Sequence, residues 1–105
     1  MNRISNLGFN GEGGDFVVSC EMRINGLGSS SKSVTVDLCD RIAEDGEGTF
    51  ILGRTWTKKT FLFKNVTNYI TQGNYNGFID FTGDFSHSDS LYNYLVVRHL
   101  CITRG

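Results

Sequence analysis

The stretch that decides the fold is Phe16-Val-Val-Ser-Cys-Glu-Met-Arg-Ile24, in which an apolar residue falls at every second position. One face of this stretch is wholly apolar and carries Phe16, Val18, Cys20, Met22 and Ile24. The opposite face carries Ser19, Glu21 and Arg23. A period of two is that of a β-strand, because a helix repeats after about 3.6 residues. We therefore predict a strand with one buried face.

The same alternation recurs in further segments, which clusters of glycine and asparagine separate. Their apolar positions are Val34, Val36, Leu38, Phe50, Leu52, Phe61, Phe63, Ile79, Phe81 and Phe85. Proline is absent, so glycine and asparagine must form the turns. Short strands at such spacing are typical of a sandwich or barrel. The residues that we expect between two sheets are Val18, Val36, Phe61, Phe63, Ile79, Phe81, Val97 and Leu100.

The last apolar segment changes phase. Leu95 and Val97 occupy odd positions, whereas Leu100 and Ile102 occupy even ones. A regular strand cannot send all four side chains to one core, since a shift of one residue exchanges the two faces. We predict a β-bulge at Arg98–His99, which would restore the phase.

Two glycine-containing segments are expected to be irregular. The segment from Gly8 to Gly14 lacks the lysine and the serine or threonine of a phosphate-binding loop, and no helix follows it. We interpret it as an opening turn. The segment from Asp40 to Gly48 is short and ends in glycine, so we predict a loop with at most one turn of helix.

Size and charge bound the possible functions. With 105 residues the chain fits one domain, residues 1–105, which can belong to a longer protein. A formal net charge of −1 carries no sign of nucleic-acid binding. No apolar run is long enough to span a membrane, so we expect no membrane insertion, and residues 1–10 lack the pattern of a signal peptide.

The three cysteines, Cys20, Cys39 and Cys101, are an odd number without a CxxC spacing. This pattern argues against a disulfide framework and against a structural zinc site. We interpret them as small apolar residues of strands, with a single bridge as the alternative.

Two parts of the chain have a distinctive strand pattern. The first comprises Ser33-Val-Thr-Val-Asp-Leu-Cys-Asp40, Thr49-Phe50 and Trp56-Thr-Lys-Lys-Thr-Phe-Leu-Phe63, and the second comprises Asn76-Gly-Phe-Ile-Asp-Phe81 and the segment from Tyr94 to Gly105. The first resembles the middle, and the second the closing strands, of carbohydrate-binding-module jelly rolls, of the type attached to xylanases and cellulases and also found in bacteriophage tail proteins. The resemblance covers about residues 16–105. The resemblance implies an all-β fold, a two-sheet antiparallel jelly-roll β-sandwich.

One departure from that family concerns calcium. Many members hold a structural calcium ion with acidic residues near the N-terminus and in the last strand, where this chain has Arg98 and His99. Glu12 and Asp15 alone supply too few of the six or more oxygen ligands that calcium takes. We therefore predict no metal and no cofactor.

The residue types of catalysis gather only between Asp84 and Ser90, where His87 and Asp89 lie among serines. Neighbours in sequence seldom converge as a triad, and one histidine with two carboxylates makes a poor metal site. We interpret the segment as a solvated loop and predict no catalytic residues. A small hydrolase that uses His87 and Asp89 is the least favoured alternative.

Aromatic residues with polar neighbours are the candidates for a binding site. A flat ring can cover the apolar face of a sugar while amides and charges bind its hydroxyls. The predicted ligand-binding residues are Trp56, Tyr75, Tyr92, Tyr94, Arg54 and Asn93. Tyr94 is out of phase with Leu95, which places it on the outer face of its sheet. Trp56 has two interpretations, a core residue at the sheet edge or part of the site.

These observations predict a non-catalytic module that binds a cell-surface glycan or polysaccharide. The resemblance implies a place in a phage tail fibre or another surface-attachment protein, on a virion or outside the cell. The alternative is a structural spacer or oligomerisation sandwich without a sugar site, and a homo-oligomer within a larger assembly is compatible with both.

Overall fold

A computed structural model describes residues 2–26, 31–67, 76–85 and 94–105 of the chain. The strands are β1 (Asn2–Ser5), β2 (Gly14–Asn25), β3 (Lys32–Leu38), β4 (Arg41–Ile42), β5 (Thr49–Leu52), β6 (Thr57–Val66), β7 (Phe78–Gly83) and β8 (Tyr94–Arg104). The helical content of these ranges is one short 3₁₀ turn, η1 (Glu44–Gly46). Within them, no helix has the length and apolar character required to cross a membrane.

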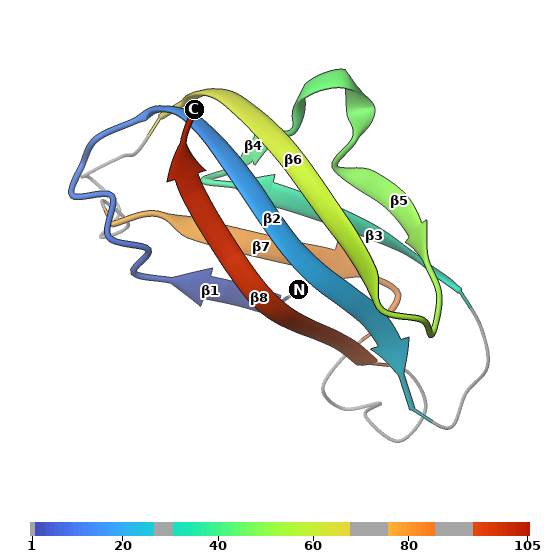
Figure 1. The fold of residues 1–105 in the computed structure, drawn as a ribbon. Helices are drawn as coiled ribbons and strands as arrows, with labels where there is room; N and C mark the ends of the chain where they lie inside the picture. The colour runs from blue at the N-terminus through green and yellow to red at the C-terminus, as the bar shows by residue number, and fades with distance from the viewer. Residues whose placement is uncertain (1, 27–30, 68–75, 86–93) are drawn as a thin grey trace.

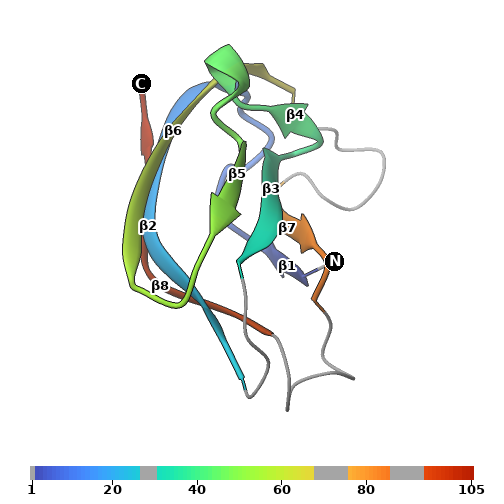
Figure 2. The same cartoon turned by 90° about the vertical axis from the view of Figure 1, so that its right-hand side faces the viewer.

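The strands form two antiparallel sheets that pack face to face (Figures 1 and 2). The five-stranded sheet has the order β1-β7-β3-β4, with β5 also paired to β3, and the three-stranded sheet has the order β6-β2-β8. Every connection except that from β3 through β4 to β5 crosses from one sheet to the other. The predicted all-β sandwich is confirmed.

The core between the sheets contains the residues that the alternation selected, with two exceptions. Val18, Val36, Phe61, Phe63, Ile79 and Phe81 are buried as predicted. The expectation for Val97 and Leu100 is corrected, because both are only half-buried, although they pack against the core. Both lie on β8, which is an edge strand of its sheet. The other edge strand of this sheet, β6, has fully buried inward side chains, because β5 covers it with the ring of Phe50 on that of Phe61. The described residues show no comparable stacking on β8.

A β-bulge restores the phase of β8, as predicted, but one residue further along. Glu21 pairs with Arg98 and Ser19 pairs with Cys101, so Cys20 alone faces His99 and Leu100. His99 has a φ of 54°, in the left-handed region. The extra residue of β8 at the bulge turns Leu100 back toward the core, as the change of phase in the sequence required.

The N-terminal segment contributes more than the predicted opening turn. Strand β1, which the alternation did not predict, precedes that turn and pairs with β7. Phe9 within the turn is buried, and its ring stacks on that of Phe16 with centroids 4.3 Å apart. Gly77, at a φ of 82°, lies so close that a Cβ atom there would overlap the ring of Phe9.

The loop from Asp40 to Gly48 is mostly as predicted, because η1 is its single helical turn, but the short strand β4 was not expected. All three cysteines are free, so the single bridge is ruled out. Cys20 and Cys39 are buried, and burial raises the pKa of the Cys20 thiol to about 11. The interpretation of the cysteines as strand residues is confirmed for Cys20 on β2 and for Cys101, which is exposed on β8, and is wrong for Cys39, which lies in the turn after β3.

Candidate functional site

The outer face of the three-stranded sheet gathers the aromatic and charged side chains that can bind a ligand. Residues directly opposite one another in an antiparallel pair project from the same face of the sheet. Glu21 on β2 faces Lys58 on β6 and Arg98 on β8, and Asn25 faces Tyr94. We call this surface the outer platform: Glu21, Arg23, Asn25, Trp56, Lys58, Tyr94, Arg98 and His99.

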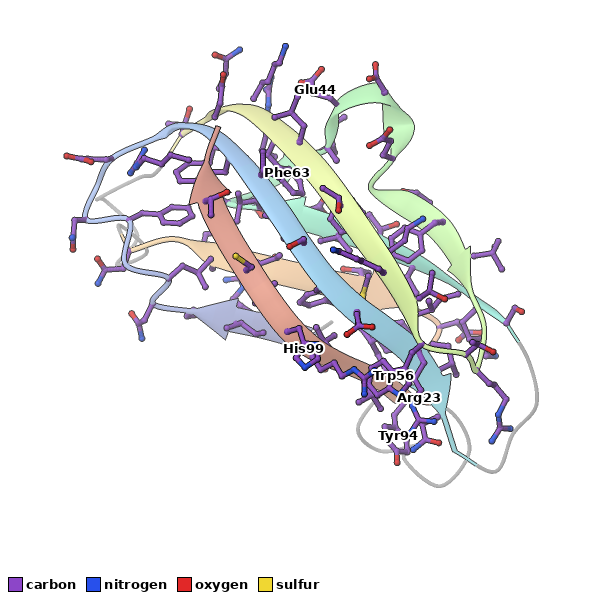
Figure 3. The ribbon with its side chains drawn as sticks, viewed as in Figure 1. Arg23, Glu44, Trp56, Phe63, Tyr94 and His99 are labelled. Carbon is purple, nitrogen blue, oxygen red and sulfur yellow. The ribbon has the colours of Figure 1, made fainter. Side chains whose placement is uncertain are left out.

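Trp56 lies at the centre of a stack that joins all three strands. The residue immediately precedes β6 and is half-buried. The guanidinium carbon of Arg98, on β8, lies 3.8 Å from the centroid of the Trp56 ring, and that of Arg23, on β2, lies 4.9 Å from it. Figure 3 shows Arg23 and Trp56 together at one end of the sheet, with His99 and Tyr94 on either side. Trp56 therefore belongs to the surface of the sheet and not to the core.

Glu21 organises the cations beside this stack. Its Oε1 atom lies 2.6 Å from Nδ1 of His99 and accepts a hydrogen bond from Nε of Arg98 at 3.3 Å. These two contacts, His99 first, hold the pKa of the Glu21 carboxyl below its ordinary value. His99 reaches Glu21 because the bulge places it on the outer side of β8.

An open hollow of about 310 Å³ adjoins the stack, lined by Ser19, Cys20, Glu21, Lys58 and His99. Its lining is mainly polar, so it suits hydroxyls or anionic groups better than an apolar ligand. At the far end of the platform, Nδ2 of Asn25 donates a hydrogen bond of 2.6 Å to Oη of Tyr94. The platform therefore presents an aromatic ring, an amide, a phenol and several charges on one open surface.

The arrangement lacks the contacts of nucleophilic catalysis. Ser19 shares the hollow with His99, but no hydrogen bond joins the two side chains in the described residues. A nucleophile and its base normally lie within hydrogen-bond reach. His87 and Asp89, the residues of the hydrolase alternative, lie outside the described residues. Among the residues described, no group of three histidine, cysteine, aspartate or glutamate side chains lies close enough to hold a metal ion.

Two of the predicted ligand-binding residues, Trp56 and Tyr94, come together on the platform. Arg54 is exposed nearby, and its Nη2 donates a hydrogen bond of 2.8 Å to the carbonyl of Gly26, which ties the turn before β6 to the end of β2. Tyr75, Tyr92 and Asn93 lie outside the described residues. The predicted outer position of Tyr94 is confirmed by its register opposite Asn25.

Sequence reasoning missed Arg23, Arg98 and the pair of Glu21 and His99 as members of the site. The alternation already placed Glu21 and Arg23 on the outer face of β2. What was lacking was the strand order, because only the pairing of β2 with both β6 and β8 brings Arg23 and Arg98 to the same tryptophan.

The outer face of the five-stranded sheet carries a different cluster. Asp80 is buried, with 3% exposed, and accepts two hydrogen bonds from Arg3 at 2.7 and 3.0 Å. Asp37 faces Asp80 across the β3–β7 pair. Burial, and then the charges of Asp80 and Asp40, raise the pKa of the Asp37 carboxyl. Arg3 satisfies Asp80, whereas the buried Oδ1 atom of Asp37 has no hydrogen-bond partner in the described residues. The cavity that Asp37 lines is small, about 110 Å³.

No protein-family model, curated protein or solved structure matches the chain. The functional argument therefore rests on the geometry of the outer platform.

Proposed function

We propose that this chain is a non-catalytic glycan-binding module. The observation that carries the proposal is Trp56, half-buried on an open sheet face beside a polar hollow. Aromatic rings pack against the C–H face of a sugar, and neighbouring amides and charges bind its hydroxyls. Asn25, Tyr94 and Lys58 supply such groups within the same platform.

The charges around Trp56 favour a glycan that carries carboxylate or sulfate groups. Arg23 and Arg98 both lie over the indole ring, so the stack presents guanidinium groups together with an aromatic edge. Nε of Arg23 is buried and has no hydrogen-bond partner in the described residues. A guanidinium fork matches a planar carboxylate, and hydrogen bonds between charged groups are stronger than neutral ones. Because Nε of Arg23 is buried, we expect the terminal guanidinium nitrogens of Arg23, together with the guanidinium of Arg98, to hold an anionic sugar.

A platform of this kind binds weakly at each copy. The surface is open on one side, so a sugar buries only part of its area there. Several linked copies would hold a polymeric glycan far more tightly than one. This agrees with a surface-attachment role, on a virion or outside the cell, which we propose from the resemblance of the strand pattern to modules of bacteriophage tail proteins.

The test is a glycan-array screen with acidic and neutral polysaccharides, run on the unaltered chain and on Trp56→Ala and Arg23→Ala. We expect the unaltered chain to retain at least one acidic glycan. Either variant should bind that glycan with an affinity lower by roughly tenfold or more, since about 1.4 kcal/mol of binding free energy corresponds to tenfold. Arg41→Ala is the matched control, because Arg41 is an exposed arginine of the other sheet.

Circular dichroism spectra of both variants must match that of the unaltered chain. If both variants keep their fold and bind as before, or if no glycan is retained, the proposal fails. The alternative of a structural module without a sugar site would then be preferred.

A further inference from the structure

Strand β8 leaves one of its edges without a partner strand. In the described residues β8 pairs with β2 alone, over almost its whole length from Tyr94 to Arg104. The backbone N–H and C=O groups on its other edge therefore have no sheet neighbour. Such an edge is a template on which another extended chain can pair.

The flank of the sandwich beneath this edge is apolar and incompletely covered. The inward side chains of β8, Leu95, Val97, Leu100 and Ile102, are only half-buried. In the facing sheet, β1 is the edge strand, and its Ile4 is 41% exposed although its register partner Ile79 is fully buried. Figure 1 shows β8 and β1 along the same side of the molecule. One further strand beside β8 would cover both the inward side chains of β8 and Ile4 of β1.

The opposite flank does not share this opening. There Nε of Arg41, on β4, donates a hydrogen bond to the carbonyl of Lys64 on β6. The Phe50 ring of β5 stacks on that of Phe61 of β6, with centroids 5.7 Å apart. Nζ of Lys59, on β6, lies over the Phe50 ring. Side chains thus join the two sheets on this flank. The incomplete cover of apolar side chains is therefore specific to the flank formed by β1 and β8.

The chemistry of β8 selects among possible occupants. The ionisable side chains of basic type on β8 are Arg98, His99 and Arg104, and the strand contains no acidic residue. Two copies of β8 paired with each other would bring arginines of both strands together, which is unfavourable. The bulge at His99 also discourages indiscriminate pairing. A strand that fits must carry apolar side chains at alternate positions toward the core and carboxylates at positions between them.

We propose that the free edge of β8 binds an extended segment of a partner polypeptide, in which apolar residues alternate with acidic or polar ones, as a fourth strand of this sheet. Its backbone pairs with β8, its apolar side chains cover Ile4 and Val97, and its carboxylates approach Arg98, which lies on the outer face. This edge adjoins the outer platform, because Arg98 belongs to both surfaces.

The experiment uses the full chain, isotopically labelled for NMR, and a synthetic peptide with valine at alternate positions and threonine or glutamate between them. The peptide should slow hydrogen exchange of the β8 amides that point away from β2 by on the order of tenfold. A peptide with lysine in place of glutamate should give much less protection at low salt. A peptide with a central proline should give none, because proline donates no backbone hydrogen bond.

Ile4→Glu should weaken peptide binding without loss of stability, because Ile4 is already partly exposed. Ile51→Glu is the matched control, since Ile51 is 70% exposed on β5 and lies on the closed flank. Absence of β8 protection at millimolar peptide, equal protection by the lysine peptide, or equal effects of the two variants would overturn the proposal. Protection of the same amides in a peptide-free dimer, detected by light scattering, would assign the edge to a second copy instead.

Discussion

Replacing Trp56 and Arg98 by alanine, singly and together, measures whether the stack at the outer platform is an energetic unit. The Arg98 guanidinium carbon lies 3.8 Å from the ring centroid, and that of Arg23 lies 4.9 Å from it. A cation over an aromatic ring contributes about 0.5–1 kcal/mol at exposed sites. The two contacts together are therefore worth about 1–2 kcal/mol, and burial of half of the indole adds about 1 kcal/mol more.

We expect Trp56→Ala to lower the free energy of unfolding by about 2–3 kcal/mol, measured by urea denaturation. The double-mutant cycle of Trp56 with Arg98 should give a coupling energy of about 0.5–1 kcal/mol, and the cycle with Arg23 a smaller one because of the longer distance. A cycle of Trp56 with Arg41, on the other sheet, serves as the control and should be additive. A coupling with Arg98 no larger than that control would refute the stack as a stabilising contact.

Three further predictions concern stability. Phe63→Ala should cost about 3–5 kcal/mol by denaturant titration, because Phe63 is fully buried between the sheets, and a loss below about 1 kcal/mol would contradict its place in the core. The pKa of Asp37 is raised in the folded state, so the ionised carboxyl destabilises the fold above that pKa. Asp37→Asn should therefore gain stability relative to the unaltered chain as the pH rises from below 3.8, and a pH-independent difference would refute the burial of Asp37 beside Asp80. Gly77→Ala should lower the melting temperature by several degrees, because alanine is strained at a φ of 82° and its methyl would meet Phe9; an unchanged melting temperature would contradict this packing.

The features of the fold that depend on the local alternation of apolar and polar residues could be predicted from the sequence. A period of two in β2 identified every buried residue from Phe16 to Ile24, because side-chain direction in a strand depends only on position along it. The change of phase between Val97 and Leu100 predicted a bulge for the same reason. The half-burial of those two residues was not predictable, since it depends on how the other strands cover β8.

The candidate site was only partly accessible from the sequence. The outward position of Tyr94 follows from its phase with Leu95 and needs no knowledge of the partner strand. The convergence of Arg23 and Arg98 on Trp56 requires the order β6-β2-β8, which joins residues far apart in the chain. Strand β1 was missed because Asn2–Ser5 is short and pairs with β7 through a contact that no local pattern reveals.

The most direct measurement of the central claim is an NMR titration of the labelled chain with an acidic polysaccharide fragment retained in the array. If the outer platform is the binding surface, the shifts will be confined to the indole N–H of Trp56, the side chains of Arg23 and Asn25, and amides of β2 and β8 around Glu21. The row of Asp37 and Asp80 on the other sheet provides the internal control and should not respond. Shifts that map to that sheet, or that spare Trp56 at saturation, would contradict the account.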